Sequence, residues 1–527
     1  MAGARLLVDI FGNLETDNLS VVVVGDTRKD IVMEIKIEIN NIRGKILNPL
    51  NIDQLSILQA ICSFKVEGSE FKAHAFKHRG RGSFEWDGYR KLFNTRYQIF
   101  PIGLLDLVRS TFVNAGIPVE VIDKRKKNNT TIPYVIKNFQ TRDYQTQAVL
   151  SSVTHGNGIV KAATGAGKTT IAARTISALK KRSIFIVHTR DLLYQTIESF
   201  TRLFPEEHIG QIGDGKIDYQ NITVATMQTL AILNDIEVGK NKYDEDSDDT
   251  SETKVQYKEI YDPDAWHKYR NSVDCVMFDE VQRICSQTAY AVRFLFEKAN
   301  YAFGYSASPW RDDGSDLMIT AAFGSRITNI TASELIRQGH LVKPYIYVKD
   351  APSVWEGTTY EQVYKTAIVE NVFRNMQVVQ DALEQYNLGR NTLVLVTQIK
   401  HGQLLEKMLG QSGVPAVFIS GKSGMKKRRQ TIDNMRNGKA QLVIASTIAD
   451  VGLDVPRLQS IIEAGAGKSS VTALQRLGRI MRPFEGKDKC YFITYRDNVP
   501  YINSHIDKKI SIWSTEEEFV IYSRCAT

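Results

Sequence analysis

The stretch "KAATGAGKTT", Lys161 to Thr170, decides how the rest of this sequence is interpreted. A phosphate-binding loop has the pattern G-x-x-x-x-G-K-[ST], and counting back from Gly167 places Ala162 where the first glycine belongs. An apolar run precedes the loop, and "KTTIAARTISALKK" after it carries apolar residues at helical spacing. Strand, glycine-rich turn and helix N-terminus form the context in which backbone N–H groups and the helix dipole meet phosphates. We therefore expect a nucleotide site despite Ala162, because the later glycines lie closest to the phosphates.

The residues of this loop receive predicted roles from the same pattern. Lys168 is expected to reach the β- and γ-phosphates, and the Thr169 hydroxyl to hold Mg²⁺. The predicted nucleotide contacts in this stretch are Thr164, Gly165, Ala166, Gly167, Lys168, Thr169 and Thr170. The predicted cofactors are ATP and Mg²⁺.

A second stretch, "CVMFDEVQR", is an apolar run that ends in two adjacent carboxylates. Downstream of a phosphate loop, such a pair predicts that Asp279 holds Mg²⁺ and that Glu280 orients and polarises the attacking water. Gln282, two residues further on, is also predicted to be catalytic. The alternative is an ordinary strand-end turn with two acids, which Lys168 upstream makes the weaker interpretation.

A third stretch, "ALQRLGRIMRP", runs from Ala473 to Pro483. Its polar residues Gln475, Arg476, Arg479 and Arg482 recur at spacings of one, three and three, which places most of them along one side of a helix. We predict catalytic roles for Gln475, Arg479 and Arg482, with an arginine finger that reaches the γ-phosphate across a cleft. The alternative is a basic helix face that contacts solvent or any polyanion.

Length and composition are those of a soluble globular protein. At ~100–200 residues per domain, 527 residues suggest about three domains. No stretch approaches the ~20 apolar residues of a membrane helix, and the first residues are a poor signal peptide, so we expect a cytoplasmic protein without a membrane partner. The five cysteines include no C-x-x-C pair, and the nine histidines show no metal-ligand spacing.

The distribution of charge points to a polyanionic partner. The chain has 67 basic and 59 acidic residues, a net charge of +8. Between Asn234 and Asp264, eleven acidic residues face four lysines, so this segment carries −7 and the remaining chain +15. A basic body with one acidic insert fits a protein that binds nucleic acid, whereas ordinary solvated faces are the alternative.

The order of predicted strands and helices divides the chain into four parts. Apolar runs alternate with helical segments from about residue 139, as in parallel sheets with crossover helices. Within the first series, residues 234–272 are too acidic to bury and are predicted to form an exposed loop. The predicted parts are an accessory domain 1–130, a first α/β unit 139–342, a second α/β unit 343–500, and a C-terminal tail 501–527.

Together the three stretches resemble the superfamily 2 helicases and translocases, and further segments match this family in the expected order. "RDYQTQAV" resembles its adenine-reading motif, which implies nucleotide contacts by Arg142 and Gln145. "SASPWR" resembles its coupling motif. "VIASTIADVGLDVP" resembles the motif of the second lobe that touches nucleotide and strand, which implies roles for Gly452 and Asp454 in nucleotide binding. The implied fold is α/β, with two tandem RecA-like lobes and a small N-terminal α+β accessory domain.

The resemblance also implies a set of DNA contacts and a branch of the family. The implied DNA-binding residues, taken from "HTRDLLYQ", "ITVATMQTL" and the second-lobe motif, are Thr189, Arg190, Thr226, Gln228 and Thr447. "DEVQ" in place of D-E-A-D, and Gln475 in place of a histidine, favour the DNA-directed branch with the XPB-like and phage UvsW-type helicases. "FEWDGYRKLFNTRYQIFPIGLL" resembles the accessory domain of the latter, although a small domain that only packs on the motor is the alternative.

The implied activity is ATP-driven remodelling of branched or forked DNA by a monomer, in recombination, repair or replication. If the chain is phage-encoded, it would act in the host cytoplasm. The alternatives are an RNA-directed helicase, a restriction-type motor subunit, and a scaffold that binds DNA with ATP but does not move.

Overall fold

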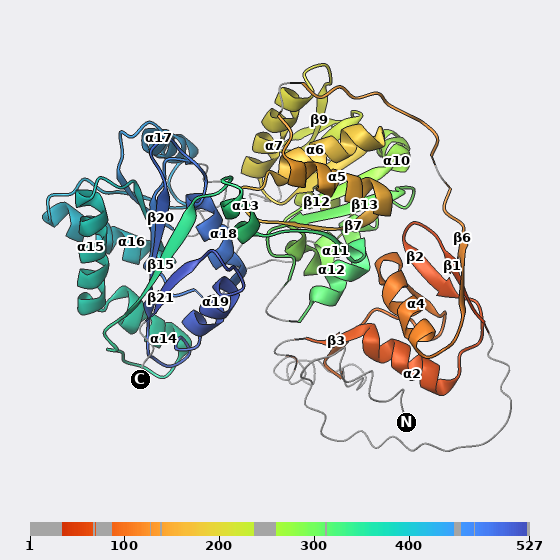
Figure 1. Cartoon of the computed structure of the whole chain (residues 1–527), viewed down its shortest axis with the longest axis horizontal. Coiled ribbons are helices and arrows are strands. Elements are labelled where there is room, and N and C mark those ends of the chain that lie inside the picture. Colours follow the sequence, from red (N-terminus) through yellow and green to blue (C-terminus); the bar gives the residue numbers. More distant parts are fainter. Residues whose placement is uncertain are drawn as a thin grey trace.

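The computed structural model describes residues 34–66, 69, 87–126, 128–137, 140–236, 260–310, 314–446, 455–467 and 470–523. Within these residues a small α+β part is followed by two lobes, each built on a large, mainly parallel sheet (Figure 1). The predicted α/β class with two tandem parallel-sheet lobes is therefore confirmed. No helix in the described part of the chain is long and apolar enough to span a membrane.

The N-terminal part holds a four-stranded sheet of order β5-β2-β1-β6 and a two-stranded sheet of β3 and β4. In β1, Ile35, Ile37 and Ile39 are buried and alternate with more exposed residues, which is the pattern of a strand with one face against a core. The elements are β1 (Ile35–Ile39), β2 (Arg43–Ile46), α2 (Ile52–Ile61), β3 (Ser63–Lys65), β4 (Tyr89–Lys91), β5 (Ile99–Pro101), η1 (Ile102–Leu104), α4 (Leu105–Asn114) and β6 (Val119–Asp123).

This part is docked on the first lobe. A Cβ at Gly103 would lie 2.0 Å from the carbonyl oxygen of Thr320 in α12, so only glycine permits this approach. Leu104 and Ala321 share one buried apolar cluster, and Asn41 Nδ2 donates to the Glu297 carbonyl at 3.2 Å. The N-terminal part and lobe 1 therefore share a core contact.

Lobe 1 is an eight-stranded sheet of order β10-β9-β11-β8-β12-β13-β7-β14, parallel except for β10. Its central strands β8 and β11 are buried along their whole length because both faces of the sheet are covered by helices. The strands are β7 (Asn157–Ala162), β8 (Ser183–Val187), β9 (Ile209–Gly213), β10 (Lys216–Asp218), β11 (Ile222–Thr226), β12 (Cys275–Asp279), β13 (Tyr301–Ser306) and β14 (Arg326–Ile330). The helices are α5 (Asp143–His155), α6 (Lys168–Leu179), α7 (Arg190–Leu203), α8 (Met227–Ile232), α10 (Pro263–Ser272), η2 (Val281–Cys285), α11 (Gln287–Arg293), α12 (Asp316–Phe323) and α13 (Ala332–Arg337).

The structure differs from the exposed loop predicted for residues 234–272. Residues 237–259 lie outside the described chain, but α10 follows them, and its Trp266 and Tyr269 are buried. Trp266 Nε1 donates to Asn234 Oδ1 at 3.0 Å, which joins the two ends of the segment. The acidic Asp262 caps α10 by accepting from two backbone N–H groups, so its charge complements a helix N-terminus rather than preventing structure.

Lobe 2 is a seven-stranded parallel sheet of order β17-β18-β16-β19-β20-β15-β21. Helices α15 and α16 lie on one side of it and α18 and α19 on the other (Figure 1). The strands are β15 (Lys343–Asp350), β16 (Thr392–Val396), β17 (Val417–Ile419), β18 (Leu442–Ser446), β19 (Ser460–Glu463), β20 (Lys489–Arg496) and β21 (Val520–Ser523). The helices are α14 (Tyr360–Tyr364), the π-helical turn η3 (Lys365–Val369), α15 (Val372–Asn387), α16 (Ile399–Gln411), α17 (Met425–Arg436), α18 (Ser470–Ile480) and α19 (His505–Trp513).

The last described residues are integrated into this lobe and reach the segment that connects the two lobes. Trp513 of α19 is fully buried, and β21 pairs with β15 at the sheet edge. The Glu516 carboxylate accepts from the backbone N–H groups of Ala332 at 3.3 Å and Ser333 at 2.8 Å, at the start of α13. The predicted tail therefore contacts the segment that connects the two sheets.

Candidate nucleotide site between the lobes

The phosphate loop lies between β7 and α6, as its sequence predicts. Gly165 and Gly167 have φ values of +91° and +80°, in the left-handed region that favours glycine. Ala162 is fully buried at the end of β7, in the same apolar cluster as Ala166. The departure from the loop pattern therefore falls on a core position of the strand. The first turn of α6, from Lys168, carries backbone N–H groups that a helix cannot satisfy itself and that phosphates accept.

Gln145 of α5 contacts this loop through a hydrogen bond. Its Nε2 donates to the Ala166 carbonyl at 3.0 Å, and the Tyr144 hydroxyl donates to the same oxygen at 3.1 Å. The Gln145 side chain is almost fully buried, and Arg142 contacts Tyr144 through a 2.9 Å hydrogen bond. The structure thus places both predicted adenine-reading residues beside the loop, and their contact with a nucleotide base stays a prediction.

The acidic pair follows β12. Lys168 Nζ lies 3.8 Å from Glu280 Oε1, so the predicted phosphate lysine and the predicted water-orienting carboxylate face one another. Glu280 has a φ of +50°, an unfavourable backbone conformation for a residue with a side chain, which costs roughly 1–3 kcal/mol and is found at functional sites.

Asp279 is suited to hold a divalent cation. Its Oδ1 is buried without a hydrogen-bond donor. Burial, reinforced by the Glu280 charge and opposed by Lys168, raises the pKa of Asp279 to about 7. A cation would satisfy this oxygen and favour the ionised form. Carboxylate and hydroxyl oxygens are the ligands Mg²⁺ prefers, so Asp279 and Thr169 fit that ion.

A chain of hydrogen bonds joins Glu280 to both lobes. Glu280 Oε2 accepts from Gln282 Nε2 at 2.8 Å and from Gln475 Nε2 of α18 at 2.9 Å. Gln282 Oε1 in turn accepts from the Ser306 hydroxyl at 2.6 Å, and Ser306 Oγ accepts from the Ser308 N–H at 3.0 Å. The stretch predicted to couple the sites therefore reaches the carboxylate through Gln282, and lobe 2 reaches it through Gln475.

Gly478 permits the close approach of lobe 2, and the sequence interpretation missed it. A Cβ on Gly478 would lie 2.1 Å from the Thr164 Cβ, so any side chain at this position of α18 collides with the phosphate loop. Gly478 follows Gln475 by three residues and so lies on the same side of the helix. The spacing of three residues between Gln475 and Gly478 could have indicated that Gly478 also faces the cleft.

The arginines of the third stretch separate into two groups. Arg476 is buried and pairs with Glu463 inside lobe 2, so it does not share the cleft-facing side of Gln475. Arg479 lies on α18 about one turn after Gln475, whereas Arg482 follows the end of that helix at Ile480, so the predicted helical spacing does not extend to Arg482. Burial, together with nearby Arg436, lowers the pKa of Arg482. Their predicted roles as arginine fingers are not tested by these contacts.

The predicted DNA contacts of lobe 1 gather at the carboxyl ends of neighbouring strands. Thr189 caps α7 and Thr226 caps α8, each by accepting from a backbone N–H. Gln228 Nε2 donates to the His188 carbonyl at 2.8 Å, and Arg190 lies 3.3 Å from Asp214. These residues therefore have structural roles in the protein alone, and contact with DNA stays a prediction. The predicted residues Thr447, Gly452 and Asp454 lie outside the described chain.

Comparison with known proteins agrees with this geometry. The family described as "Type III restriction enzyme, res subunit" matches residues 138–311, and the family described as "Helicase conserved C-terminal domain" matches residues 374–483. A solved structure of S. cerevisiae Dbp5 bound to RNA and ADP BeF3 is similar with a TM-score of 0.50 at 14% identity, covering 72% of this chain and 89% of that chain. At this identity the likeness concerns the fold alone. The chain is a superfamily 2 helicase, an ATP-hydrolysing enzyme with two RecA-like lobes.

Two similar proteins indicate its relatives within that class. The "ATP-dependent DNA helicase uvsW" of Enterobacteria phage T4 is 22% identical over 453 residues, which are 77% of this chain and 83% of that protein. The "DNA 3'-5' translocase XPB2" of Sulfurisphaera tokodaii is 24% identical over 426 residues, with 72% and 86% covered. The predicted resemblance to UvsW-type and XPB-like helicases is thereby confirmed.

Proposed function

We propose that this ATP-hydrolysing DNA helicase remodels branched DNA, by fork regression, branch migration or unwinding of displacement loops. The observation that carries the motor part of this proposal is the 2.9 Å hydrogen bond from Gln475 of lobe 2 to Glu280 of lobe 1. It joins the predicted water-orienting group to the second lobe, so closure of the lobes and assembly of the active site are one event.

The residues of the site divide the work of hydrolysis. Lys168 and the backbone of the loop bind the phosphates. Thr169 and Asp279 would hold the cation, which would supply positive charge against the phosphate oxygens. Glu280 accepts a hydrogen bond from the attacking water and orients it in line with the bond that breaks. Arg479 and Arg482 stabilise the γ-phosphate charge from the opposite lobe.

Hydrolysis and phosphate release then remove the γ-phosphate that Arg479 and Arg482 contact. The hydrogen bond from Gln475 to Glu280 remains, but the closed arrangement is held less strongly, so the lobes separate. The strand-contacting residues Thr189, Arg190, Thr226 and Gln228 lie at one edge of the lobe 1 sheet, and separation shifts them relative to lobe 2. Contacts of this kind go mostly to phosphates and carry little sequence information.

The choice of branched DNA rests on two features. Similar proteins are named as a DNA helicase and a DNA translocase. The N-terminal part is basic, with 20 Lys and Arg against 15 Asp and Glu between Met1 and Gln140, and it is docked on lobe 1 through Gly103. A rigidly docked basic part can bind a duplex arm while the lobes engage a strand, and its affinity should fall as salt rises.

ATP hydrolysis measured side by side with single-stranded DNA, linear duplex, a fork, a four-way junction and RNA tests the proposal. We expect the branched substrates to give the largest stimulation. Stronger stimulation by RNA would favour an RNA-directed helicase. Tight DNA binding without stimulated hydrolysis would favour a scaffold, and equal stimulation by linear and branched DNA would remove the branched-DNA assignment.

A further inference from the structure

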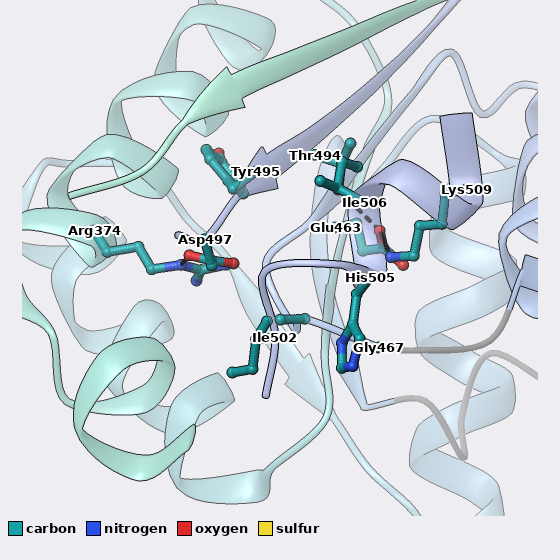
Figure 2. Close-up of a pocket in the computed structure, with 11 residues that line it drawn as sticks. Arg374, Glu463, Gly467, Thr494, Tyr495, Asp497, Ile502, His505, Ile506 and Lys509 are labelled. Atoms are coloured by element: carbon teal, nitrogen blue, oxygen red, sulfur yellow. Dashed lines mark hydrogen bonds and ion pairs between the residues drawn. The ribbon is translucent and has the colours of Figure 1, made fainter. Parts of the chain in front are cut away.

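A buried carboxylate connects α18 to the C-terminal helix α19. Glu463, at the end of β19, accepts through Oε1 from Arg476 of α18 and through Oε2 from Lys509 of α19 at 2.6 Å. Thr494 of β20 also donates to Oε2 at 2.9 Å, and Figure 2 shows Glu463, Thr494 and Lys509 side by side. Glu463, Arg476 and Lys509 are each less than 5% exposed.

The charges in this cluster depend on one another. Burial alone raises the pKa of Glu463, but Lys509 and Arg476 more than offset it and hold that pKa below its usual value. The carboxylate is therefore ionised and accepts from both cations. A buried ion group of this kind is sensitive to the loss of one member, because the remaining charges are then left uncompensated away from water.

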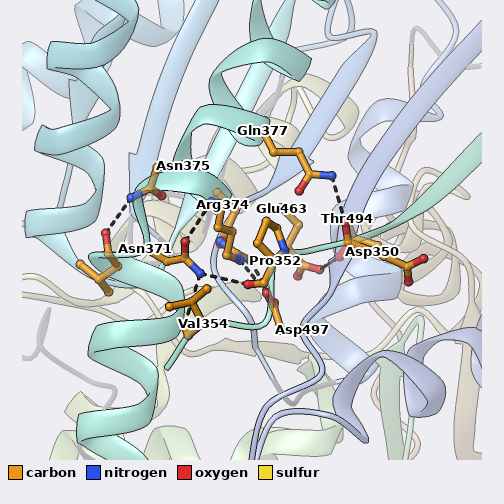
Figure 3. Close-up of polar contacts among 12 residues, drawn as sticks. Asp350, Pro352, Val354, Asn371, Arg374, Asn375, Gln377, Glu463, Thr494 and Asp497 are labelled. Carbon is orange, nitrogen blue, oxygen red and sulfur yellow. Dashed lines mark hydrogen bonds and ion pairs between the residues drawn. The ribbon is translucent and has the colours of Figure 1, made fainter. Parts of the chain in front are cut away.

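A second buried pair holds the next residue of the chain. Arg374 of α15 forms a bidentate contact with Asp497, at 2.6 and 3.0 Å, and donates to the Ala464 carbonyl at 2.7 Å. Figure 3 shows this pair beside Asn371, whose side chain donates to the Pro352 carbonyl at 3.0 Å. The end of β19 is thus held from both sides of the sheet, just before the chain continues toward α18.

The cavity beside these residues does not suit a ligand. It is lined by Arg374, Glu463, Asp497, His505 and Lys509, and it encloses about 10 Å³. That is roughly the space for one water molecule. The cluster therefore acts on protein elements rather than on a bound molecule.

We propose that Lys509, acting through Glu463 and Arg476, positions α18 so that Gln475 reaches Glu280. Gln475 and Arg476 are adjacent on the helix, so their side chains point about 100° apart. Any rotation or shift of α18 that follows from loss of the Arg476 anchor moves Gln475 as well. Lys509 is thus a positioning residue for hydrolysis, supplied by the C-terminal segment, and this inference rests on the proposed function of the cleft.

The full-length Lys509→Met variant tests this role. Because misplacement of a catalytic group by about 1 Å costs on the order of 100-fold, we expect DNA-stimulated kcat to fall about 10- to 100-fold. The KM for ATP should change less, since the phosphate loop belongs to lobe 1. Lys509→Arg should keep most of the activity. Lys508→Met, exposed on the same helix, should match the wild type.

A double-mutant cycle separates positioning from general destabilisation. If Lys509 acts through Gln475, Lys509→Met should cause a much smaller loss of kcat in a Gln475→Ala background than in the wild type. Lys349→Met breaks another cation–carboxylate pair of the same lobe, between Lys349 of β15 and Asp381 of α15, and its effect should be independent of Gln475. An additive cycle, or wild-type kcat in a folded Lys509→Met protein, overturns the inference.

A second variant and a second measurement complete the test. If Lys509→Met does not fold, Thr494→Val removes one hydrogen bond to Glu463, and the same cycle with Gln475→Ala applies to a smaller loss. Measurement of basal hydrolysis without DNA separates the two hypotheses. A wild type without DNA stimulation contradicts the proposed function, while a non-additive cycle on basal hydrolysis still supports the positioning role.

Discussion

Two helices meet at the candidate nucleotide site, and they are placed there in different ways. The helix α6 begins at Lys168 directly after the phosphate loop, so its functional residues are consecutive in the chain. The helix α18 comes from the other lobe, and its approach depends on Gly478 against Thr164 and on Arg476 against Glu463. The first half of the site is a local property of the chain, whereas the second half depends on contacts between distant segments. Substitutions at the start of α6 should therefore abolish ATP hydrolysis, whereas substitutions around α18 should lower its rate by amounts that depend on the residue changed.

The largest effect should follow a change at the start of α6. Lys168→Ala should abolish ATP hydrolysis, because the backbone of the loop remains but the cation that meets the β- and γ-phosphates is lost. Hydrolysis and thermal unfolding are measured together, with the exposed Lys216→Ala as a matched lysine control. Normal turnover in a folded Lys168→Ala protein would show that this loop does not bind the hydrolysed nucleotide.

A smaller but still large loss should follow removal of a predicted arginine finger. Arg482→Ala should reduce kcat on the order of 10³-fold, as with other arginine fingers, while nucleotide affinity changes less. The measurement is single-turnover hydrolysis beside nucleotide binding by fluorescence. If hydrolysis survives and only DNA affinity falls, Arg482 belongs to a basic surface for nucleic acid.

The approach of α18 to the phosphate loop should depend on the size of the side chain at position 478. Gly478→Ala should reduce kcat on the order of tenfold, because the new Cβ would lie 2.1 Å from Thr164 and the lobes must move apart. Thr164→Gly in the same protein should restore part of the loss, because it removes the colliding atoms. Gly410→Ala in α16, where a Cβ meets nothing within 4 Å, is the control. Equal activity of Gly478→Ala and wild type would mean that hydrolysis does not need this approach.

The smallest effect is expected for the acidic segment. Replacement of residues 237–259 by a short Gly-Ser loop should leave ATP hydrolysis and thermal stability unchanged. Asn234 and Trp266 remain to join the two ends, and none of the predicted site residues lies between them. A deletion that continued through α10 should destabilise lobe 1, because Trp266 and Tyr269 are core residues. Loss of hydrolysis in the shorter deletion would show that the segment takes part in the motor.

Particular residues show where sequence patterns were sufficient. Lys168 and Glu280 could be paired in advance, because each follows an apolar strand and the carboxyl ends of parallel strands share one edge. The predicted exposed loop extended too far, to Ser272. That prediction followed from the number of acidic residues and did not take account of the aromatic residues Trp266 and Tyr269, which are buried in α10. No catalytic role is predicted for Arg476, and the structure pairs it with Glu463 inside lobe 2, a contact between distant segments that the spacing of the motif does not show.

The sequence by itself determined the α/β class, the phosphate loop and the acidic pair, because each depends on residues close together in the chain and on strand or helix periodicity. Only the tertiary structure decided that Gln475 meets Glu280, that Gly478 must lack a side chain, and that Lys509 belongs to the same network. These contacts join segments far apart in the chain. Their geometry follows from how the sheets and helices pack, which no local pattern of residues specifies.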